Sequence, residues 1–195
     1  MRYCASRADS PGDRIAAYRI RHECYLRENY ISPKDNEQFS DEFDLQENCE
    51  TVLLHDESGS IVGSARLSLL DCSSPLRIPA QSCFPAEIAS LMWPEDYAWR
   101  AVEINRLVCR DFAKYKSFSA RLLALYKSLA DHSLIATADL ILACVREEHL
   151  RLYNRFGFLQ IAGPKLYHSV RFEVYLLCLF RQGFNALWRM LKVLQ

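Results

Sequence analysis

A glutamate and an arginine lie within residues 102–109, a segment that otherwise has the composition of a buried strand. Both residue types are almost never fully buried unless they are paired, so a strand that carries both is either salt-bridged or lines a cleft. In a cleft, Glu103 would have a raised pKa and could accept a proton from a nucleophile, while Arg106 limits that rise or binds a substrate carboxylate. The alternative is an internal ion pair that only fixes strand register.

The spacing of Glu103 and Arg106 sets a geometric condition. Strict alternation places the two side chains on opposite faces of a strand, so they can share one pocket only if a β-bulge adds a residue between them. Bulges are frequent beside active sites. The enzymatic interpretation therefore predicts a bulge in this strand and requires both side chains to project into one gap in the sheet.

The strand is held by elements that hydrophobic periodicity and turn residues predict. The first half should contain a short initial strand, a helix over 13–29 capped by Asp13, a loop over 30–50 with a short ordered piece at 41–44, hairpin strands over 51–55 and 61–70, and an irregular excursion over 71–99 with a short helix at 86–91. The second half should contain the strand 102–109, a basic loop, a helix over 119–132, a strand over 139–145, a helix over 147–156 closed by Gly157, and a last strand over 168–180. This alternation predicts a layered α/β (α+β) domain with a mixed sheet.

The chain ends in an amphipathic stretch, residues 183–195, with its apolar residues on one helical stripe. We expect this helix to pack against the core or against a second subunit in a homodimer. The alternative is a peripheral contact with a membrane surface.

Composition limits the class of protein. A chain of 195 residues suits one domain with a sizeable core, spanning 1–195. Its eight cysteines are scattered singly, without a C-x-x-C pair or a His spacing for a metal, so we expect reduced core residues in a cytoplasmic protein and no metal site. We find no N-terminal segment like a signal peptide, and the longest apolar run, 174–180, is too short to cross a bilayer.

Charge is unevenly distributed although the formal net charge is zero. Residues 35–50 hold seven acidic residues and no basic one, whereas residues 100–127, the basic segment, hold seven basic residues and two acidic ones. The basic segment could attract phosphate or an acidic protein, or it could be a solvated helix face. The acidic residues elsewhere and a pI near 6.9 count against nucleic acid.

The element order, with Phe156-Gly157-Phe158 after Tyr153, resembles the GNAT acyltransferase fold. Within that fold, four further pieces resemble the ordered signature of acyl-homoserine-lactone synthases and long-chain N-acyl amino acid synthases: Arg21 with Tyr25, Asp41-Glu42-Phe43-Asp44, Gly63 with Arg66-Leu67, and Glu103-Ile104-Asn105-Arg106-Leu107. The resemblance covers most of residues 13–180. It implies a mostly antiparallel, twisted sheet with a splayed central strand pair, and an enzyme that takes a fatty acyl group from acyl carrier protein.

Departures from the pattern narrow the choice of substrates. Ile31 stands where homoserine-lactone synthases usually have Trp, and Asn105 where these families commonly have Ser, which counts against S-adenosylmethionine as the acceptor. The loop 110–118 lacks the Gly-x-Gly that typical acetyl-CoA enzymes of this fold wrap around a pyrophosphate, which counts against free coenzyme A as the donor.

The resemblance also implies roles for individual residues. Glu103 would be the base, and Tyr153 would protonate the leaving thiolate, unless it is only a core aromatic residue. A backbone N–H of the strand 102–109, exposed where the sheet splays, would bind the oxyanion. The acceptor pocket would be surrounded by Arg21, Tyr25, Asp41, Asp44 and Arg66, which could equally form an ion-pair network that orders the loop 30–50.

Donor binding is expected at the start of the helix that follows the basic loop. Its unpaired N–H groups and dipole favour the phosphate of phosphopantetheine, and the basic side chains would face an acidic carrier protein. The residues expected to bind the donor are Arg110, Lys114, Lys116, Ser117, Phe118, Ser119 and Arg121.

Together these observations predict an N-acyltransferase without a tightly bound cofactor. It would transfer a medium or long acyl chain from acyl carrier protein, or from acyl-CoA, to the amine of an amino acid or similar small molecule. The alternatives are an acyl-homoserine-lactone-type autoinducer synthase, a CoA-dependent N-acetyltransferase, and a catalytically silent protein of the same fold that binds a carrier or other partner protein.

Overall fold

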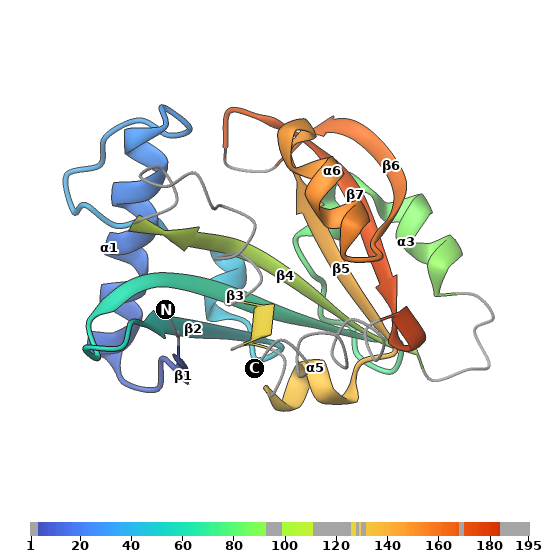
Figure 1. Cartoon of the computed structure of the whole chain (residues 1–195), viewed down its shortest axis with the longest axis horizontal. Helices are drawn as coiled ribbons and strands as arrows, with labels where there is room; N and C mark the ends of the chain where they lie inside the picture. Colours follow the sequence, from blue (N-terminus) through green and yellow to red (C-terminus); the bar gives the residue numbers. More distant parts are fainter. Residues whose placement is uncertain are drawn as a thin grey trace.

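One mixed, mostly antiparallel sheet in the order β1-β2-β3-β4-β5-β7-β6 organises the chain (Figure 1). The computed structural model describes residues 4–92, 99–110, 126, 127, 129, 132–167 and 170–183. The strands are β1 (Cys4–Arg7), β2 (Cys49–His55), β3 (Ile61–Asp71), β4 (Arg100–Cys109), β5 (Leu140–Val145), β6 (Leu159–Leu166) and β7 (Glu173–Phe180). The helical elements are α1 (Pro11–Arg27), η1 (Glu42–Leu45), α2 (Ala80–Cys83), α3 (Pro85–Leu91), α5 (Ser133–Thr137) and α6 (Glu147–Arg155).

The central strands β4 and β5 are the parallel pair, and they are paired over only three positions. The register runs from Ala101 opposite Leu140 to Glu103 opposite Leu142, and beyond it the two strands diverge (Figure 1). The splay that the sequence implied is therefore present. The backbone of β4 after Glu103 has no strand partner on its β5 side within the described residues.

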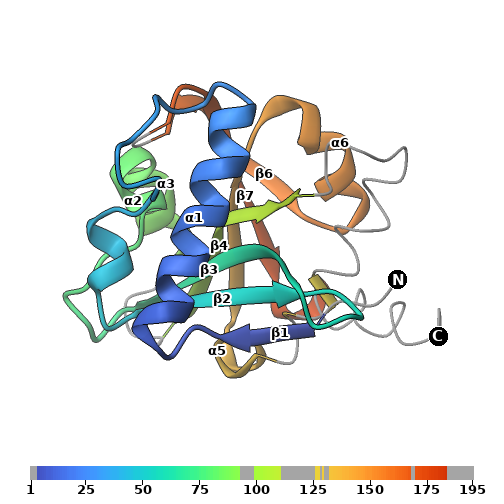
Figure 2. The same ribbon diagram turned by 90° about the vertical axis from the view of Figure 1, so that its left-hand side faces the viewer.

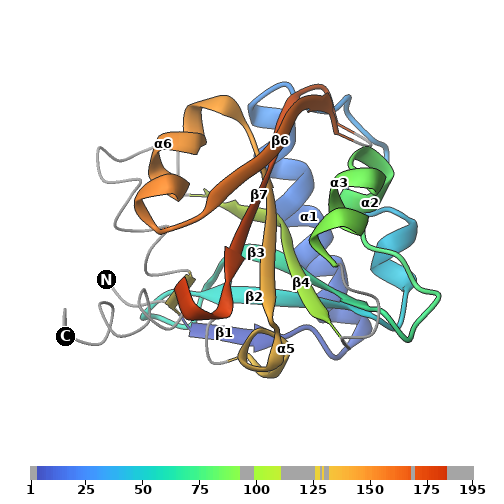
Figure 3. The same cartoon turned by 90° about the vertical axis from the view of Figure 1, so that its right-hand side faces the viewer.

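Helices cover both faces of the sheet. Figure 2 shows α1 lying across β2 and β3, and Figure 3 shows α6 on the opposite side of the sheet from α1, α2 and α3. The apolar side chains divide accordingly: one cluster contains Ile104 and Tyr153, and another contains Ala80, Ile88 and Leu142. No helix in the described part of the chain combines the length and the apolar character needed to cross a membrane.

The predicted β-bulge is confirmed in β4. Arg66 on β3 pairs with Asn105 and Ser64 pairs with Val108, so Ala65 alone lies opposite two residues, Arg106 and Leu107. Arg106 has a φ of 50°, in the left-handed region that a non-glycine residue adopts only when its surroundings impose it. The extra residue brings Arg106 to the same face as the side chains at 103 and 105.

The first helix begins earlier than predicted, and the prediction of Asp13 as its cap is wrong. Ser10 is the N-cap: its Oγ accepts the Asp13 N–H at 3.1 Å, and Asp13 Oδ2 accepts the Ser10 N–H at 3.2 Å. Asp13 thus occupies the third helical position of a capping box, and Pro11 occupies the first, where its missing N–H costs nothing.

The second half contains elements that the sequence did not predict. Strand β6 was missed because its exposed residues show no alternation and include Gly163 and Pro164, and α2 is only one turn long. The last strand begins at Glu173, not at 168. The helix predicted over 119–132 lies mostly outside the described residues, although Tyr126, Lys127 and Leu129 are helical. The C-terminal helix predicted over 183–195 also lies outside them, except for Gly183.

Gly63 should be intolerant of a side chain, because β3 and β4 approach closely beside the bulge. A Cβ at this position would lie 2.3 Å from the Val108 carbonyl oxygen, a backbone atom that can move only if the strands move. We expect Gly63→Ala to lower the free energy of unfolding by about 1–3 kcal/mol in urea denaturation. The matched control is Gly12→Ala in α1, where the nearest atom is the Ser10 Oγ at 3.6 Å. Equal stability of the two variants would contradict this packing.

Candidate active site

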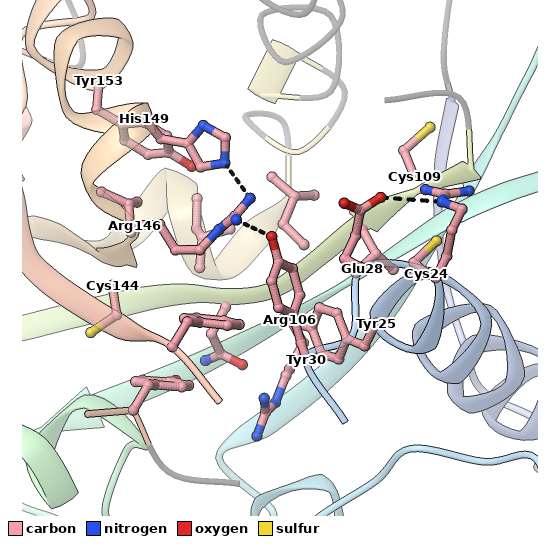
Figure 4. Close-up of a pocket in the computed structure, with 18 residues that line it drawn as sticks. Cys24, Tyr25, Glu28, Tyr30, Arg106, Cys109, Cys144, Arg146, His149 and Tyr153 are labelled. Atoms are coloured by element: carbon pink, nitrogen blue, oxygen red, sulfur yellow. Dashed lines mark hydrogen bonds and ion pairs between the residues drawn. The ribbon is translucent and has the colours of Figure 1, made fainter. Parts of the chain in front are cut away.

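The splay between β4 and β5 opens into a cavity of about 500 Å³, named here the splay cavity (Figure 4). Its walls come from both sides of the sheet's opening: Ile104–Cys109 on β4, Cys144–Arg146 at the end of β5, and His149 and Tyr153 on α6. Cys24, Tyr25, Arg27, Glu28 and Tyr30 close it from α1 and the turn after it, and Tyr167 and Phe172 complete it. Its lining mixes apolar side chains with charged and polar ones, which suits a ligand of mixed character.

Glu103 is sealed behind this cavity. Its side chain is 0% exposed, and it does not border the splay cavity. Oε2 accepts the Ala80 N–H at 2.9 Å, and Oε1 accepts the hydroxyl proton of Tyr167 at 3.0 Å. Burial raises the pKa of Glu103, although these hydrogen bonds and the charges of Arg66 and Arg106 oppose the rise. The predicted rise of the Glu103 pKa is confirmed. The prediction that the Glu103 side chain projects directly into the gap is wrong.

Arg106 does reach the cavity. Its Nη2 donates to Asp41 Oδ2 at 2.6 Å, and its guanidinium lies 4.8 Å from the ring centre of Phe39 and 5.5 Å from that of Tyr167. Tyr167 therefore contacts both Arg106 and Glu103, which shows that the bulge places the two side chains on one face of the sheet. Arg106 forms its ion pair with Asp41, and the Glu103 oxygens accept from Ala80 and Tyr167. An ion pair between Glu103 and Arg106 therefore does not account for their positions.

The charged residues beside the site form one continuous ion-pair network. Its links are Arg21 to Asp44 at 2.7 Å, Asp44 to Arg66 at 3.0 Å, Arg66 to Asp41 at 2.5 Å and Asp41 to Arg106 at 2.6 Å. Burial alone would raise the pKa of Asp41, but hydrogen bonds and charge from Arg66 and Arg106 hold it well below its usual range. Arg66 also donates from Nε to Asn105 Oδ1 at 2.7 Å, which explains the buried amide beside the bulge.

This network orders the loop before β2. Asp41 Oδ1 accepts the Phe43 N–H at 3.1 Å, and Asp44 Oδ2 accepts the Asp41 N–H at 3.0 Å, so the Asp-Glu-Phe-Asp sequence is a capping box around η1. The predicted acceptor residues are thereby divided. Arg21 and Arg66 border neither cavity described here, whereas Tyr25 borders the splay cavity and Asp41 borders a second one.

The second cavity, named here the loop cavity, has a volume of about 710 Å³. It lies between residues 30–42, the end of α2, and the residues Leu166, Tyr167, Val170 and Arg171. Its charged side chains have both signs: Lys34, Asp41, Glu42 and Arg171. Tyr30 and Tyr167 line both cavities, so these two residues form the wall between them.

Tyr153 lies on the wall of the splay cavity and also in the core. Its hydroxyl accepts a hydrogen bond from the Tyr126 hydroxyl at 3.0 Å, and its ring packs edge-on against Phe158. Burial raises the pKa of Tyr153 to about 12, so the phenol stays protonated at neutral pH. The geometry brings Tyr153 to the cavity as predicted, and it adds Tyr126 as a partner that the sequence did not indicate.

Arg146 is a cavity residue that sequence reasoning missed. It follows β5 and donates to the Tyr30 hydroxyl and, at 3.2 Å, to His149 Nε2, so it spans the cavity from α6 to the residues after α1 (Figure 4). Its guanidinium also lies 4.6 Å from the ring centre of Tyr30. In the sequence Arg146 precedes two glutamates and reads as a solvated helix start. The one usable signal was its position directly after a buried strand.

The predicted donor residues fall mostly outside the described part of the chain. This applies to Lys114, Lys116, Ser117, Phe118, Ser119 and Arg121. Arg110 is described: its Nε donates to Glu23 Oε2 at 2.8 Å and its Nη1 to the Ile61 carbonyl at 3.2 Å. It therefore connects the end of β4 to α1 and β3.

A mixed sheet that splays at a central parallel pair is the fold of the GNAT-like acyltransferases, and solved structures share it with this chain. FeeM, an N-acyl amino acid synthase from uncultured soil microbes, has a TM-score of 0.71 and 19% identity, with 95% of this chain and 93% of that chain covered. BjaI, a CoA-dependent acyl-homoserine lactone synthase, has a TM-score of 0.64 and 16% identity, with 98% and 89% covered. The acyl-homoserine lactone synthase LasI has a TM-score of 0.62 and 17% identity, with 90% and 88% covered.

The sequence itself identifies the family. The family model described as N-acyl amino acid synthase FeeM matches residues 16–179, which is most of the chain. The chain therefore belongs to the FeeM family of N-acyl amino acid synthases and is an acyltransferase. No curated protein sequence matches it significantly. The resemblance drawn from the residues is confirmed.

Asp41 should contribute more to stability than an ordinary surface carboxylate, because it forms ion pairs with both Arg66 and Arg106. We expect Asp41→Asn to lower the free energy of unfolding by about 3–5 kcal/mol at pH 7, since it removes a buried carboxylate from Arg106 and one of the two carboxylates that pair with Arg66. The depressed pKa of Asp41 means that its contribution is complete above the unfolded value of about 4 and is lost as pH falls. Urea denaturation across pH should therefore show the two proteins converging below about pH 4.

The matched control for this measurement is Asp9→Asn. Asp9 pairs with Arg7 at 2.9 Å, but both side chains are exposed, so little change is expected. A difference between wild type and Asp41→Asn that stays constant from neutral to acid pH would contradict the assignment.

Proposed function

We propose that this acyltransferase moves a medium- or long-chain fatty acyl group from the phosphopantetheine thioester of acyl carrier protein to the amine of an amino acid. The observation that carries the proposal is the splay cavity, which opens beside the backbone of β4. Tyr167 lines this cavity and hydrogen-bonds the buried Glu103, so it connects the two. Membership of the N-acyl amino acid synthase family supports the amino acid acceptor.

The thioester belongs in the splay cavity. Ile104, Leu107 and Val145 supply apolar walls for the acyl chain, and the β4 backbone beyond Glu103 supplies N–H groups for the oxyanion that forms when the carbonyl is attacked. Tyr153, protonated at neutral pH, donates the proton that the leaving thiolate takes. Each group acts where charge develops during the reaction.

The amino acid belongs in the loop cavity. A zwitterion carries both charges, and this cavity offers Lys34 and Arg171 to a carboxylate and Asp41 and Glu42 to an ammonium group. The shared wall of Tyr30 and Tyr167 is the place where the amine meets the thioester. Glu103 is the final base, and Arg106 keeps the pKa of Glu103 from rising further.

The donor follows from the basic segment, whose charge complements an acidic carrier protein. BjaI shows that the same fold also occurs in a CoA-dependent enzyme, so the donor requires its own test. Purified protein should be incubated with matched acyl carrier protein and CoA thioesters of several chain lengths and a pool of amino acids, with mass spectrometry of the products. N-acyl amino acids formed preferentially from acyl carrier protein are expected. Formation from CoA alone would overturn the carrier assignment.

Replacing the base should remove both rate and pH dependence. Because the pKa of Glu103 is raised above its usual range, kcat/KM of the wild type should increase with pH as this carboxyl group ionises. We expect Glu103→Gln to lower kcat about 10²- to 10⁴-fold, to flatten this rise, and to leave the unfolding transition intact. An unchanged rate in Glu103→Gln would remove this residue from the base role.

Charge reversal in the basic segment should weaken the use of acyl carrier protein as the donor. Lys114→Glu with Lys116→Glu is expected to raise KM for acyl carrier protein at low salt, with the difference shrinking as salt screens the charges, and to leave kcat unchanged. The control pair is Arg19→Glu with Arg77→Glu, two exposed residues that border neither cavity. The same loss in both pairs would contradict a specific docking role for the basic segment.

A further inference from the structure

We propose that Tyr167 is a catalytic proton relay: its phenol oxygen takes a proton from the acceptor amine while its own hydroxyl proton passes to Glu103. This inference rests on the proposed function and assigns the route by which the proton leaves the amine. It gives a role to a tyrosine that neither the sequence pattern nor the family resemblance singled out.

The first observation is that Glu103 has no opening to either cavity. Its side chain is 0% exposed and borders neither the splay cavity nor the loop cavity. One of its oxygens is occupied by the Ala80 N–H at 2.9 Å, and the other by the Tyr167 hydroxyl at 3.0 Å. A base that cannot contact its substrate needs an intermediary with an exchangeable proton.

The second observation is that Tyr167 is placed where that intermediary must be. Tyr167 lines both cavities, so a substrate in either one lies beside this residue. Its backbone N–H donates to the Phe172 carbonyl at 3.1 Å, which fixes the residue between β6 and β7. Among the described residues that border a cavity, Tyr167 is the one that hydrogen-bonds Glu103.

The third observation is the charge that surrounds the phenol. Arg106 lies 5.5 Å from its ring centre, and burial together with the nearby Glu103 raises the pKa of Tyr167 well above its usual range. A phenolate is therefore an unfavourable stopping point. The two proton transfers should be concerted, with the phenol neutral before and after.

The proton balance closes without a further reactant. The acceptor's ammonium form first loses one proton to solvent. When the resulting free amine has attacked the thioester carbonyl, one N–H bond of the now positively charged nitrogen breaks and an O–H bond forms on Tyr167. The original Tyr167 O–H bond breaks at the same time, and an O–H bond forms on Glu103 Oε1. The carboxylate becomes neutral and the nitrogen loses its positive charge. After the product leaves, the reverse transfer returns the proton through Tyr167 to solvent, and Tyr153 regains from solvent the proton that it gave to the thiolate.

Removing one hydroxyl group tests the relay. Tyr167→Phe keeps the ring that separates the cavities and loses the O–H group, so we expect kcat with an amino acid acceptor to fall about 10²- to 10⁴-fold while KM for both substrates changes little. The control is Tyr175→Phe on β7, which borders neither cavity and should retain the wild-type rate. The double variant with Glu103→Gln should be no slower than the slower single variant, because both residues serve one proton path.

A second acceptor separates a relay from a merely structural role. Hydroxylamine is already uncharged at neutral pH. Once it has attacked the carbonyl, its nitrogen loses a proton to water more readily than the nitrogen of an amino acid does. Tyr167→Phe should therefore lose much less of its rate with hydroxylamine. Equal losses with the two acceptors, or a Tyr167→Phe rate within threefold of wild type, would overturn the relay and leave the proposed function standing. A wild type that forms no N-acyl amino acid would overturn both.

Discussion

Parallel pairing between β4 and β5 stops at Glu103, and the site depends on this single constraint. Up to that residue the central strands share a continuous ladder, and beyond it each strand exposes backbone and side chains to the splay cavity. The last paired position is buried from both sides, which explains why its carboxyl group has a raised pKa. The next residues of β4 form the wall of the cavity. The proposed base and an open backbone edge are thus adjacent because one ladder ends.

The bulge places a further buried charge beside this site, and the ion-pair network compensates it. Inserting Arg106 opposite Ala65 brings its guanidinium to the face that already holds Arg66 and Arg21, and three buried cations require compensation. Asp41 and Asp44 supply it, and both reach the sheet because they cap η1. The loop before β2 is therefore held against the sheet by charge, and the same loop forms one side of the loop cavity. Four of the residues that the resemblance placed around an acceptor form the ion-pair network that holds this loop: Arg21, Asp41, Asp44 and Arg66.

Much of this could be predicted from local sequence, and the failures have physical causes. The bulge followed from two charges at an odd spacing in a buried strand, and the hairpin β2–β3 from turn residues between two apolar runs. Strand β6 could not be found because its side chains are exposed and do not alternate. Tyr167 was missed for a different reason: its importance lies in a hydrogen bond to a residue 64 positions away, and no local pattern records such a contact. The same holds for Arg146 and Tyr30, which meet across the splay cavity.

The central claim is that acyl transfer takes place at the wall between the two cavities, beside Tyr167. A crystal structure of the protein with a bound N-acyl amino acid tests it most directly. The account predicts the acyl chain in the splay cavity and the amino acid portion in the loop cavity. The amide nitrogen should lie within hydrogen-bonding distance of the Tyr167 hydroxyl, and that hydroxyl should still donate its hydrogen bond to Glu103. A product bound with its amide remote from Tyr167, or lying wholly within one cavity, would contradict it.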